Sequence, residues 1–210
     1  HLAPIGGIDR VYVVTNDRFA TNFEQWAARY GAAKSKLDFT IVNDGSTDDA
    51  NKLGAIGDLH LVLTREQVED DLLVVAGDNL FSQSLEGFGQ FCRAKNAPVL
   101  GVYDVGRLEE TKKYNSIALD GEGRITHFEE KPAQPTSTLI GIALYFYPRA
   151  VLPLVHRYIA EGNNPDQPGR LIQWLHPRLP VYTWTVPGLW YDIGSKENLD
   201  EANRIFAHLP

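Results

Sequence analysis

The sequence predicts an α/β protein with a Rossmann-like, doubly wound and mostly parallel central sheet, helices on both faces, and a mixed or antiparallel second half. Between residues 8 and 104, short apolar segments typical of strands alternate with amphipathic segments typical of helices. This alternation is the pattern of a parallel sheet with crossover helices. After about residue 105 it gives way to a hairpin and a long strand. Hydrophobic residues make up 43% and charged residues 22% of the chain, which suits one globular domain over residues 1–210.

The first half of the chain supplies the alternating elements. Strands are predicted at residues 8–15, 38–42, 72–76 and 99–104. Helices are predicted at residues 21–30, 54–65 and 85–95, where apolar residues recur every three or four positions. The faces expected to be buried consist of Phe23, Trp26, Ala27 and Tyr30 in the first helix, Ile56, Leu59 and Leu63 in the second, and Leu85, Phe88, Phe91 and Cys92 in the third.

The second half supplies the hairpin and the last helices. Residues 115–120 and 124–129 are predicted to pair across the turn at residues 120–123. A strand at 138–147, a helix at 151–159, a short helix at 171–175 and a strand at 181–186 follow. Ser195 is the expected N-cap of a last helix, with Leu199, Ala202, Ile205 and Phe206 on its buried face.

The bulk properties exclude several classes of protein. The formal net charge is −7, which argues against a nucleic-acid surface but not against an anionic ligand held by a few local cations. A single cysteine, Cys92, excludes an internal disulfide and a cysteine-rich zinc site and suits a reducing cytoplasm, with core packing as its expected role. No apolar run approaches the about 20 residues of a membrane span. The aromatic-rich C-terminal third suits either core or interface, so a homo-oligomer stays open.

The strand at residues 72–76 is followed by Gly77, Asp78 and Asn79. Four apolar residues without alternation suggest a strand covered on both faces, as in the middle of a parallel sheet. Open α/β sheets bind ligands at the carboxyl ends of their strands, where Asp78 is expected to lie. A carboxylate at this place suits a hard divalent cation held against a phosphate. An ordinary turn is an equally good interpretation, because all three residues are turn formers.

Two further sites carry charges after predicted strands. Lys131, between Glu130 and Pro132, is a mobile ammonium suited to a phosphate, and Glu130 could accept hydrogen bonds from sugar hydroxyls. A surface ion pair is the alternative. Asp192, within residues 190–195 (WYDIGS), is a candidate second metal ligand, because Mg²⁺ is usually held by one or two carboxylates plus substrate phosphates. A cap at a helix start is its alternative.

Gly54 and Gly57 stand at the predicted start of the second helix. Glycines at a helix start let the backbone approach a flat ligand or a phosphate closely. Their spacing is not that of a dinucleotide-binding fingerprint. The alternative is that both glycines pack the helix tightly against its neighbours.

Taken in order, these segments resemble the sugar-1-phosphate nucleotidylyltransferases, and in particular the glucose-1-phosphate thymidylyltransferase-like members. The matching segments span nearly the whole chain and consist of residues 75–79 (VAGDN), Tyr114 with the hairpin after it, 128–132 (FEEKP), 141–148 (GIALYFYP), 190–194 (WYDIG) and the helix at 197–203. The resemblance implies a Rossmann-like fold. It also implies the Mg²⁺-dependent reaction of an NTP with a sugar 1-phosphate to give an NDP-sugar and pyrophosphate, with glucose 1-phosphate and dTTP or UTP as the favoured pair.

The resemblance also implies roles for single residues. Asp78 and Asp192 would hold the metal, and together with Lys131 they would form the catalytic set. Lys131 would bind the sugar phosphate and Glu130 the sugar, while Gly54 and Gly57 would lie near the nucleobase. The remaining implied substrate contacts are Asn79, Tyr114 and Gly141.

The chain departs from the family in two places. The family opens with a glycine-rich loop that contains an arginine, followed by a lysine, and these cradle the triphosphate; this chain starts at His1, where the family's second strand would begin. We expect that the missing strand and loop lie upstream, since a sheet without them would expose unpaired edges. In addition, Asn115 follows Tyr114 where the family usually has glycine, which bears on a close backbone contact to the sugar.

Two alternatives from other classes remain. Residues 40–48 (TIVNDGSTD) resemble the nucleotide-binding segment of inverting glycosyltransferases, but residues 77–79 (GDN) lack the Asp-x-Asp pattern that such enzymes place after a later strand. A non-catalytic sugar-nucleotide sensor becomes an alternative if the phosphate loop is truly absent. Metal-dependent turnover would exclude that sensor.

Overall fold

The computed structural model describes residues 2–34 and 37–207, which form two compact units. The first unit comprises His1–Gly6, Asp71–Arg149 and Ile172–Pro210. The second comprises Gly7–Asp70 and Ala150–Leu171. The expectation of a single domain over residues 1–210 stays a prediction.

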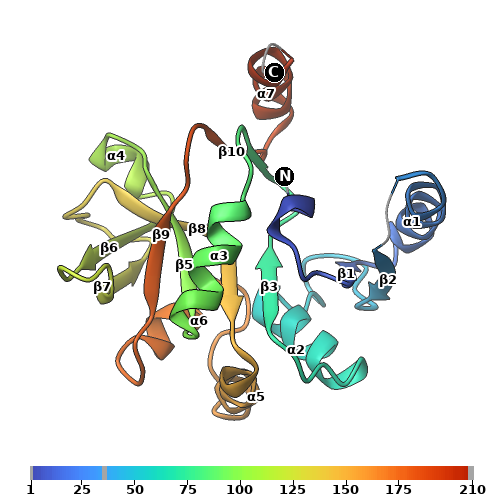
Figure 1. The fold of residues 1–210 in the computed structure, drawn as a ribbon, viewed down its shortest axis with the longest axis horizontal. Helices are drawn as coiled ribbons and strands as arrows, with labels where there is room; N and C mark the ends of the chain where they lie inside the picture. The colour runs from blue at the N-terminus through green and yellow to red at the C-terminus, as the bar shows by residue number, and fades with distance from the viewer. Residues whose placement is uncertain (1, 35–36, 208–210) are drawn as a thin grey trace. The chain divides into compact units, whose positions relative to one another are not determined.

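A four-stranded mixed sheet forms the centre of the first unit. Its order is β3 (Leu72–Val75), β8 (Leu139–Tyr147), β5 (Val99–Asp104) and β9 (Tyr182–Thr185), as Figure 1 shows. β8 runs antiparallel to both of its neighbours, whereas β5 and β9 are parallel. The predicted α/β class with parallel and mixed strands is confirmed.

The structure corrects the expected surroundings of β3. This strand lies at the end of the sheet order in the described residues, pairs antiparallel with β8, and is only half-buried along its length. An apolar run indicates burial but does not report the direction of the neighbouring strand. Here the long β8, which arrives late in the chain, takes the place beside β3.

Helix α3 (Glu86–Lys95) packs on the sheet of the first unit. Its Phe88 is fully buried and meets the Trp184 ring of β9 edge-on at 5.5 Å between centroids. Cys92 is also buried, which confirms its predicted place and raises the pKa of its thiol to about 12. The short helix η1 (Ala3–Ile5) is held by Arg93, whose Nη2 donates to the Ile5 carbonyl oxygen at 3.2 Å.

Two antiparallel ribbons complete the first unit. The predicted hairpin is confirmed as β6 (Asn115–Leu119) and β7 (Ile125–Glu130), with β6 lying against β8. The second ribbon pairs β4 (Asn79–Phe81) with β10 (Trp190–Asp192) and was not predicted. The short helix α4 (Leu108–Thr111) was not predicted either. A strand of three residues is too short to show a period in the sequence, and its partner lies far along the chain.

Helix α7 (Lys196–Phe206) begins where the sequence predicts. The Ser195 side chain accepts the Asn198 N–H at 3.1 Å, which confirms the N-cap. Ala202 is fully buried, but Leu199 is 43% exposed, which corrects its predicted burial. The apolar period identifies a face of the helix, but it does not say how far the neighbouring surface extends along that face.

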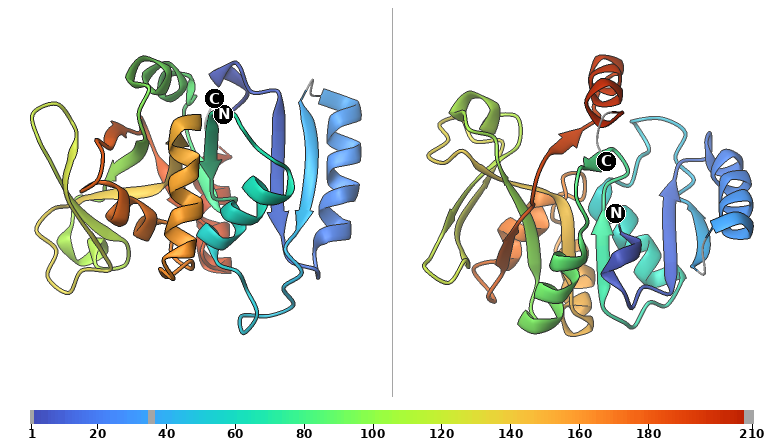
Figure 2. Two further views of the ribbon diagram at one scale, coloured as in Figure 1. Left: turned by 90° about the horizontal axis from the view of Figure 1, so that it is seen from below. Right: turned by 45° about the horizontal axis from the view of Figure 1, so that its top comes forward.

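The second unit contains a parallel pair of strands, β1 (Arg10–Thr15) and β2 (Asp38–Asn43). Helix α1 (Ala20–Lys34) runs along this pair, mainly against β2 (Figures 1 and 2). The aromatic face of α1 is only partly covered, because Phe23, Trp26 and Tyr30 are 37–40% exposed. Phe39 of β2 contacts the rings of Trp26 and Tyr30 edge-on. The two strands cover only part of this aromatic face, which corrects its predicted burial.

Helices α2 (Ala55–Arg65) and α5 (Leu152–Ala160) pack on each other in the second unit. Ile56 and Leu63 are buried as predicted, and Leu59 is half-buried. The rings of His60 and His156 meet edge-on between the two helices, at 4.9 Å between centroids. The 3-10 turn η2 (Arg149–Val151) leads into α5, and α6 (Gly169–Leu175) follows it. Within the described residues, no helix has the length and apolar character needed to cross a membrane.

Candidate functional site

The pairing of β4 with β10 brings the two predicted metal carboxylates together in the first unit. Asp192 is the ladder partner of Asn79, and the Ile193 N–H donates to the Asp78 carbonyl oxygen at 2.9 Å. Partial burial and the nearby negative charge of Asp78 raise the pKa of Asp192, against a hydrogen bond from Tyr114 that lowers it. Two carboxylates that repel each other in this way favour the approach of a cation.

A set of hydrogen bonds orients these carboxylates. Asn79 Nδ2 donates to Asp78 Oδ1 at 2.8 Å, and the indole Nε1 of Trp190 donates to Asn79 Oδ1 at 2.6 Å. The Tyr114 hydroxyl lies close enough to the Asp192 carboxylate to lower its pKa. The hydrogen bond from Asn79 therefore orients Asp78, and Asp192 has a neighbouring hydroxyl that favours its charged form.

Asp78 and Asp192 fit a divalent cation of the Mg²⁺ type. Mg²⁺ prefers oxygen ligands and usually takes only one or two of them from protein carboxylates. In the part of the chain that the structure describes, no group of three or more His, Cys, Asp or Glu side chains could hold a metal. The pair therefore suits an ion whose remaining positions are filled by phosphate oxygens and water, rather than a closed protein cage.

Glu130 and Lys131 lie where β7 ends and the chain leaves the hairpin. Lys131 has φ of 48°, a left-handed conformation that few residues with side chains adopt. Its N–H donates to the Tyr114 carbonyl oxygen at 2.8 Å, and the following Pro132 is buried. Glu130 is half-buried, and its charge, added to the larger effect of burial, raises the pKa of Tyr145 on β8. The Lys131 side chain is exposed and able to meet an anion.

Tyr114 connects the two groups of charged residues. Its carbonyl oxygen accepts the Lys131 N–H, and its hydroxyl lies near the Asp192 carboxylate and lowers its pKa. Its ring meets the Trp190 ring edge-on at 5.6 Å between centroids. The structure thus brings six of the predicted residues into one neighbourhood of the first unit: Asp78, Asn79, Tyr114, Glu130, Lys131 and Asp192.

Gly141 on β8 has its backbone polar groups satisfied within the protein. Its N–H donates to Asn115 Oδ1 at 2.6 Å, and Asn115 Nδ2 donates to its carbonyl oxygen at 2.9 Å. A Cβ at this position would lie 2.6 Å from Leu100 Cδ2, so a larger residue would have to displace the Leu100 side chain. Contact of Gly141 with a sugar stays a prediction. Asn115, which the sequence showed only as a departure from the family pattern, proves to be its partner.

Gly54 and Gly57 lie in the second unit, at the start of α2. Gly54 has φ of 79°, and a Cβ there would lie 2.5 Å from the Asp166 Cα. The first two N–H groups of α2 donate to the carbonyl oxygens of Asp166 and Pro165, at 3.2 and 2.8 Å. Tight packing, the alternative that the sequence left open, therefore accounts for Gly54. The expected nearness of both glycines to a nucleobase stays a prediction.

The turn after β2 uses its own polar groups. The Asp44 carboxylate accepts the N–H and the hydroxyl of Ser46 at 2.8 and 2.7 Å, and Asn43 Oδ1 accepts the Gly45 N–H at 2.8 Å. These are local turn contacts. They show that residues 43–46 satisfy one another's polar groups within the turn.

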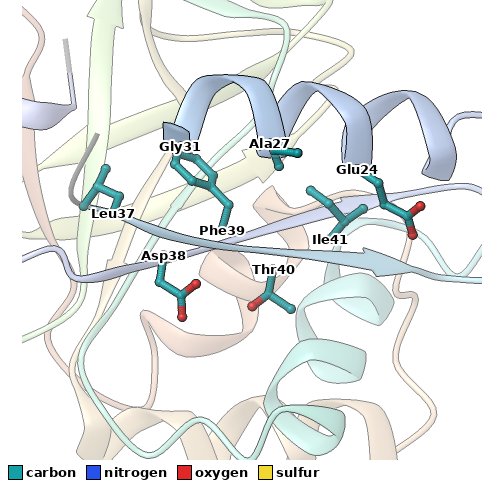
Figure 3. A pocket seen from close by; sticks show the side chains of 9 residues that line it. Glu24, Ala27, Gly31, Leu37, Asp38, Phe39, Thr40 and Ile41 are labelled. Carbon is teal, nitrogen blue, oxygen red and sulfur yellow. The ribbon is translucent and has the colours of Figure 1, made fainter. Parts of the chain in front are cut away.

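Two grooves lie away from these residues. One, of about 650 Å³, lies between α1 and β2 in the second unit; Phe39 and Ile41 point towards the helix, whereas Asp38 and Thr40 point to the other side of β2 (Figure 3). The other, of about 500 Å³ in the first unit, runs along residues 124–126 and 176–180. Neither groove contains a predicted site residue, so the candidate site rests on the chemistry and contacts of its side chains.

Trp190 also belongs to this neighbourhood, although the sequence analysis gave it no role of its own. It stands inside a motif that was singled out, two positions before Asp192. A tryptophan that becomes buried usually needs a partner for its N–H. This need indicates that Trp190 has a hydrogen-bond partner, but it does not identify that partner. The partner is Asn79, on another strand more than 100 residues earlier.

The chain was compared with known proteins. It matches the family described as Nucleotidyl transferase over residues 2–208. The crystal structure of a UDP-glucose pyrophosphorylase complexed with UDP-glucose aligns with a TM-score of 0.78 and 21% identity, over 98% of this chain and 83% of that one. A Bacillus anthracis protein described as a glucose-1-phosphate thymidylyltransferase, in complex with a sucrose, aligns with a TM-score of 0.73 and 19% identity, over 95% and 76% of the two chains. At these identities the likeness establishes the fold.

Proposed function

Because the chain belongs to the nucleotidyl transferase family, we propose that it transfers a nucleotidyl group from an NTP to a sugar 1-phosphate and releases pyrophosphate. The observation that carries this proposal is Tyr114, which connects the acidic pair of Asp78 and Asp192 with Lys131. A cation site next to an exposed ammonium suits two phosphate-bearing substrates that must be brought together. The names of the two similar structures support glucose 1-phosphate with UTP or dTTP as the first pair to test.

The reaction requires little covalent chemistry from the protein. A phosphate oxygen of the sugar 1-phosphate attacks the α-phosphorus of the NTP, a new P–O bond forms, and the bond to the leaving pyrophosphate breaks. In such transfers the protein mainly positions the reactants and stabilises the developing charge. The chain must therefore align two anions that repel each other, although its own net charge is −7.

Each residue has a distinct part in that alignment. Lys131 pairs with the sugar phosphate and lowers its repulsion from the NTP, while Glu130 accepts hydrogen bonds from sugar hydroxyls. Asp78 and Asp192 would hold Mg²⁺, which when bound would supply positive charge to offset that of the phosphates. Tyr114 keeps Asp192 oriented through its hydroxyl. Its carbonyl oxygen fixes the backbone at Lys131, so that the groups serving the two substrates keep a constant geometry.

Pyrophosphate release tests this proposal. The protein is mixed with Mg²⁺, each of the common NTPs and dTTP, and a panel of sugar 1-phosphates that includes those of glucose, mannose and N-acetylglucosamine. We expect release that needs both substrates and stops with a chelator. Asp78→Asn should lower the rate by at least about a hundredfold, since even groups behind a metal ligand are worth tenfold to a hundredfold.

The matched control is Asp200→Asn, which neutralises an exposed carboxylate on α7 and should retain the wild-type rate. Release that needs no sugar phosphate, or an Asp78→Asn protein as active as the control, would refute the proposal. No release with any pair would favour a non-catalytic sugar-nucleotide binder. The cytoplasmic location and a homo-oligomeric state stay predictions.

A further inference from the structure

We propose that Trp190 is a positioning residue that orients both carboxylates of the acidic pair, Asp78 through Asn79 and Asp192 through Tyr114. This inference rests on the proposed function, because it concerns how the same site is held ready for its cation. Trp190 would act on the two carboxylates through its contacts with Asn79 and Tyr114. Two separate routes lead from the indole to the pair.

The first route runs from the indole nitrogen to Asp78. Trp190 is 9% exposed, and its Nε1 lies 2.6 Å from Asn79 Oδ1. An indole N–H can only donate, so it holds the amide of Asn79 with its oxygen towards Trp190. The amide nitrogen is then directed to Asp78 Oδ1, at 2.8 Å. The tryptophan thereby selects the one amide orientation that donates to the carboxylate.

The second route runs from the indole ring to Asp192. Trp190 and Asp192 are two apart on β10, so their side chains leave the same face of the ribbon. The Trp190 ring packs edge-on against Tyr114 and, tilted, against Tyr103, both at 5.6 Å between centroids. Tyr114 is therefore held from the side by the indole, on the face of the ribbon that also carries Asp192.

The like charges of Asp78 and Asp192 explain why their side chains need to be held by neighbouring residues. Asp78 and Asp192 are two like charges held close together, because Asp192 is the ladder partner of Asn79 and the Ile193 N–H donates to the Asp78 carbonyl oxygen. Without fixed donors, each side chain would gain by rotating away from the other. Donors placed behind metal ligands in this manner typically contribute tenfold to a hundredfold to metal affinity or activity.

The test uses Trp190→Phe, which keeps an aromatic ring against Tyr114 and removes the N–H. Mn²⁺ alone is titrated into the protein without substrates and followed by electron paramagnetic resonance. We expect the Kd for Mn²⁺ to rise about tenfold. In the assay, the Mg²⁺ concentration for half-maximal rate should rise by a similar factor, whereas kcat at saturating Mg²⁺ should stay within about twofold of the wild type. The control is Trp184→Phe, whose indole packs on Phe88, and it should bind Mn²⁺ as the wild type does.

A second variant separates positioning from general weakening of the fold. If Trp190 acts on Asp78 through Asn79, then Asn79→Ala should weaken Mn²⁺ binding by itself, and the Asn79→Ala, Trp190→Phe double variant should be no weaker than the worse single variant. Wild-type affinity in both single variants, or fully additive effects in the double variant, would overturn the inference. A wild-type protein that binds no Mn²⁺ would overturn it together with the metal site of the proposed function.

Discussion

At the scale of single residues, Asp58 on α2 shows how burial and a like charge act together. Its carboxyl is half-buried and lies near the carboxylate of Asp44, and its Oδ1 is buried without a hydrogen-bond partner. Burial is the larger cause and the charge of Asp44 the second, and together they raise the pKa of Asp58 from 3.8 to about 6. The folded protein therefore holds a proton on Asp58 more tightly than the unfolded chain does.

This shift predicts how stability depends on pH. Between pH 3.8 and about 6 the folded state binds more protons at Asp58 than the unfolded state, so this residue's contribution to the free energy of unfolding falls as pH rises. Asp58→Asn removes the titration and keeps a donor for Asp44. We expect it to stabilise the protein by about 1 kcal/mol above pH 6, an effect reduced by solvent screening, and to match the wild type near pH 4.

Urea unfolding at pH 4 and pH 7.5 measures the difference. Asp49→Asn is the control, because its carboxylate is fully exposed in the segment before α2 and should shift neither value. An Asp58→Asn protein less stable than the wild type at pH 7.5 would contradict this prediction, because it would show that the charged form of Asp58 does not destabilise the folded protein.

The charged residues of the site could be predicted individually, whereas those that orient them could not. Asp78, Lys131 and Asp192 were recognisable because each lies in a short motif, and these motifs follow one another in the order of the family pattern. Trp190 and Asn115 gain their importance from the atoms that their polar groups meet, on strands far away in the sequence. No periodicity or spacing within a single sequence reports such a pairing.

At the scale of elements, Asn115 joins the hairpin to the central sheet. It opens β6, and its amide forms a reciprocal pair of hydrogen bonds with the buried backbone of Gly141 on β8. Tyr114, Glu130 and Lys131 all lie at the open end of the hairpin, where Asn115 is paired with Glu130 and the Lys131 N–H donates to the Tyr114 carbonyl oxygen. The position of these three residues against β8 therefore depends on the amide of Asn115.

Substitution of Asn115 should be costly, because it leaves buried polar groups of Gly141 without partners. For Asn115→Ala we expect a loss of about 1–3 kcal/mol in the free energy of unfolding, the usual cost of a buried unsatisfied group. Asn115→Asp should also destabilise, since its carboxylate can accept from the Gly141 N–H but cannot donate to the carbonyl oxygen.

Urea unfolding of Asn115→Ala, Asn115→Asp and the exposed control Asn203→Ala measures this cost. Wild-type stability in both Asn115 variants would mean that water or a local rearrangement satisfies Gly141. If only Asn115→Ala loses stability, then the hydrogen bond that the Gly141 N–H donates to residue 115 contributes more than the bond to the Gly141 carbonyl oxygen.

The elements themselves were predictable to different degrees. The strand at 99–104 and the helix at 85–95 follow from strong periodicity and appear at almost the same bounds in β5 and α3. The order and direction of the strands were not predictable, because β8 enters between β3 and β5 from later in the chain. The β4–β10 ribbon, which holds the acidic pair, was missed because each of its strands is only three residues long.

At the scale of the whole molecule, the residues of the candidate site belong to one compact unit, with Gly54 and Gly57 in the other. The acidic pair, Tyr114 and Lys131 are held together by contacts within the first unit alone. The net charge of −7 makes local cations essential for two phosphate-bearing substrates. In the proposed function, Lys131 and a bound Mg²⁺ would supply that positive charge.

The central claim is that this chain joins an NTP to a sugar 1-phosphate, and ³¹P nuclear magnetic resonance of the reaction mixture tests it most directly. The protein is incubated with Mg²⁺, UTP or dTTP, and glucose 1-phosphate. We expect the monoester and triphosphate signals to fall together while pyrophosphate and a sugar-linked diphosphate rise in equal amounts. A spectrum in which the nucleotide is consumed while glucose 1-phosphate stays intact, or in which no diphosphate diester forms with any NTP and sugar 1-phosphate of the panel, would contradict the account.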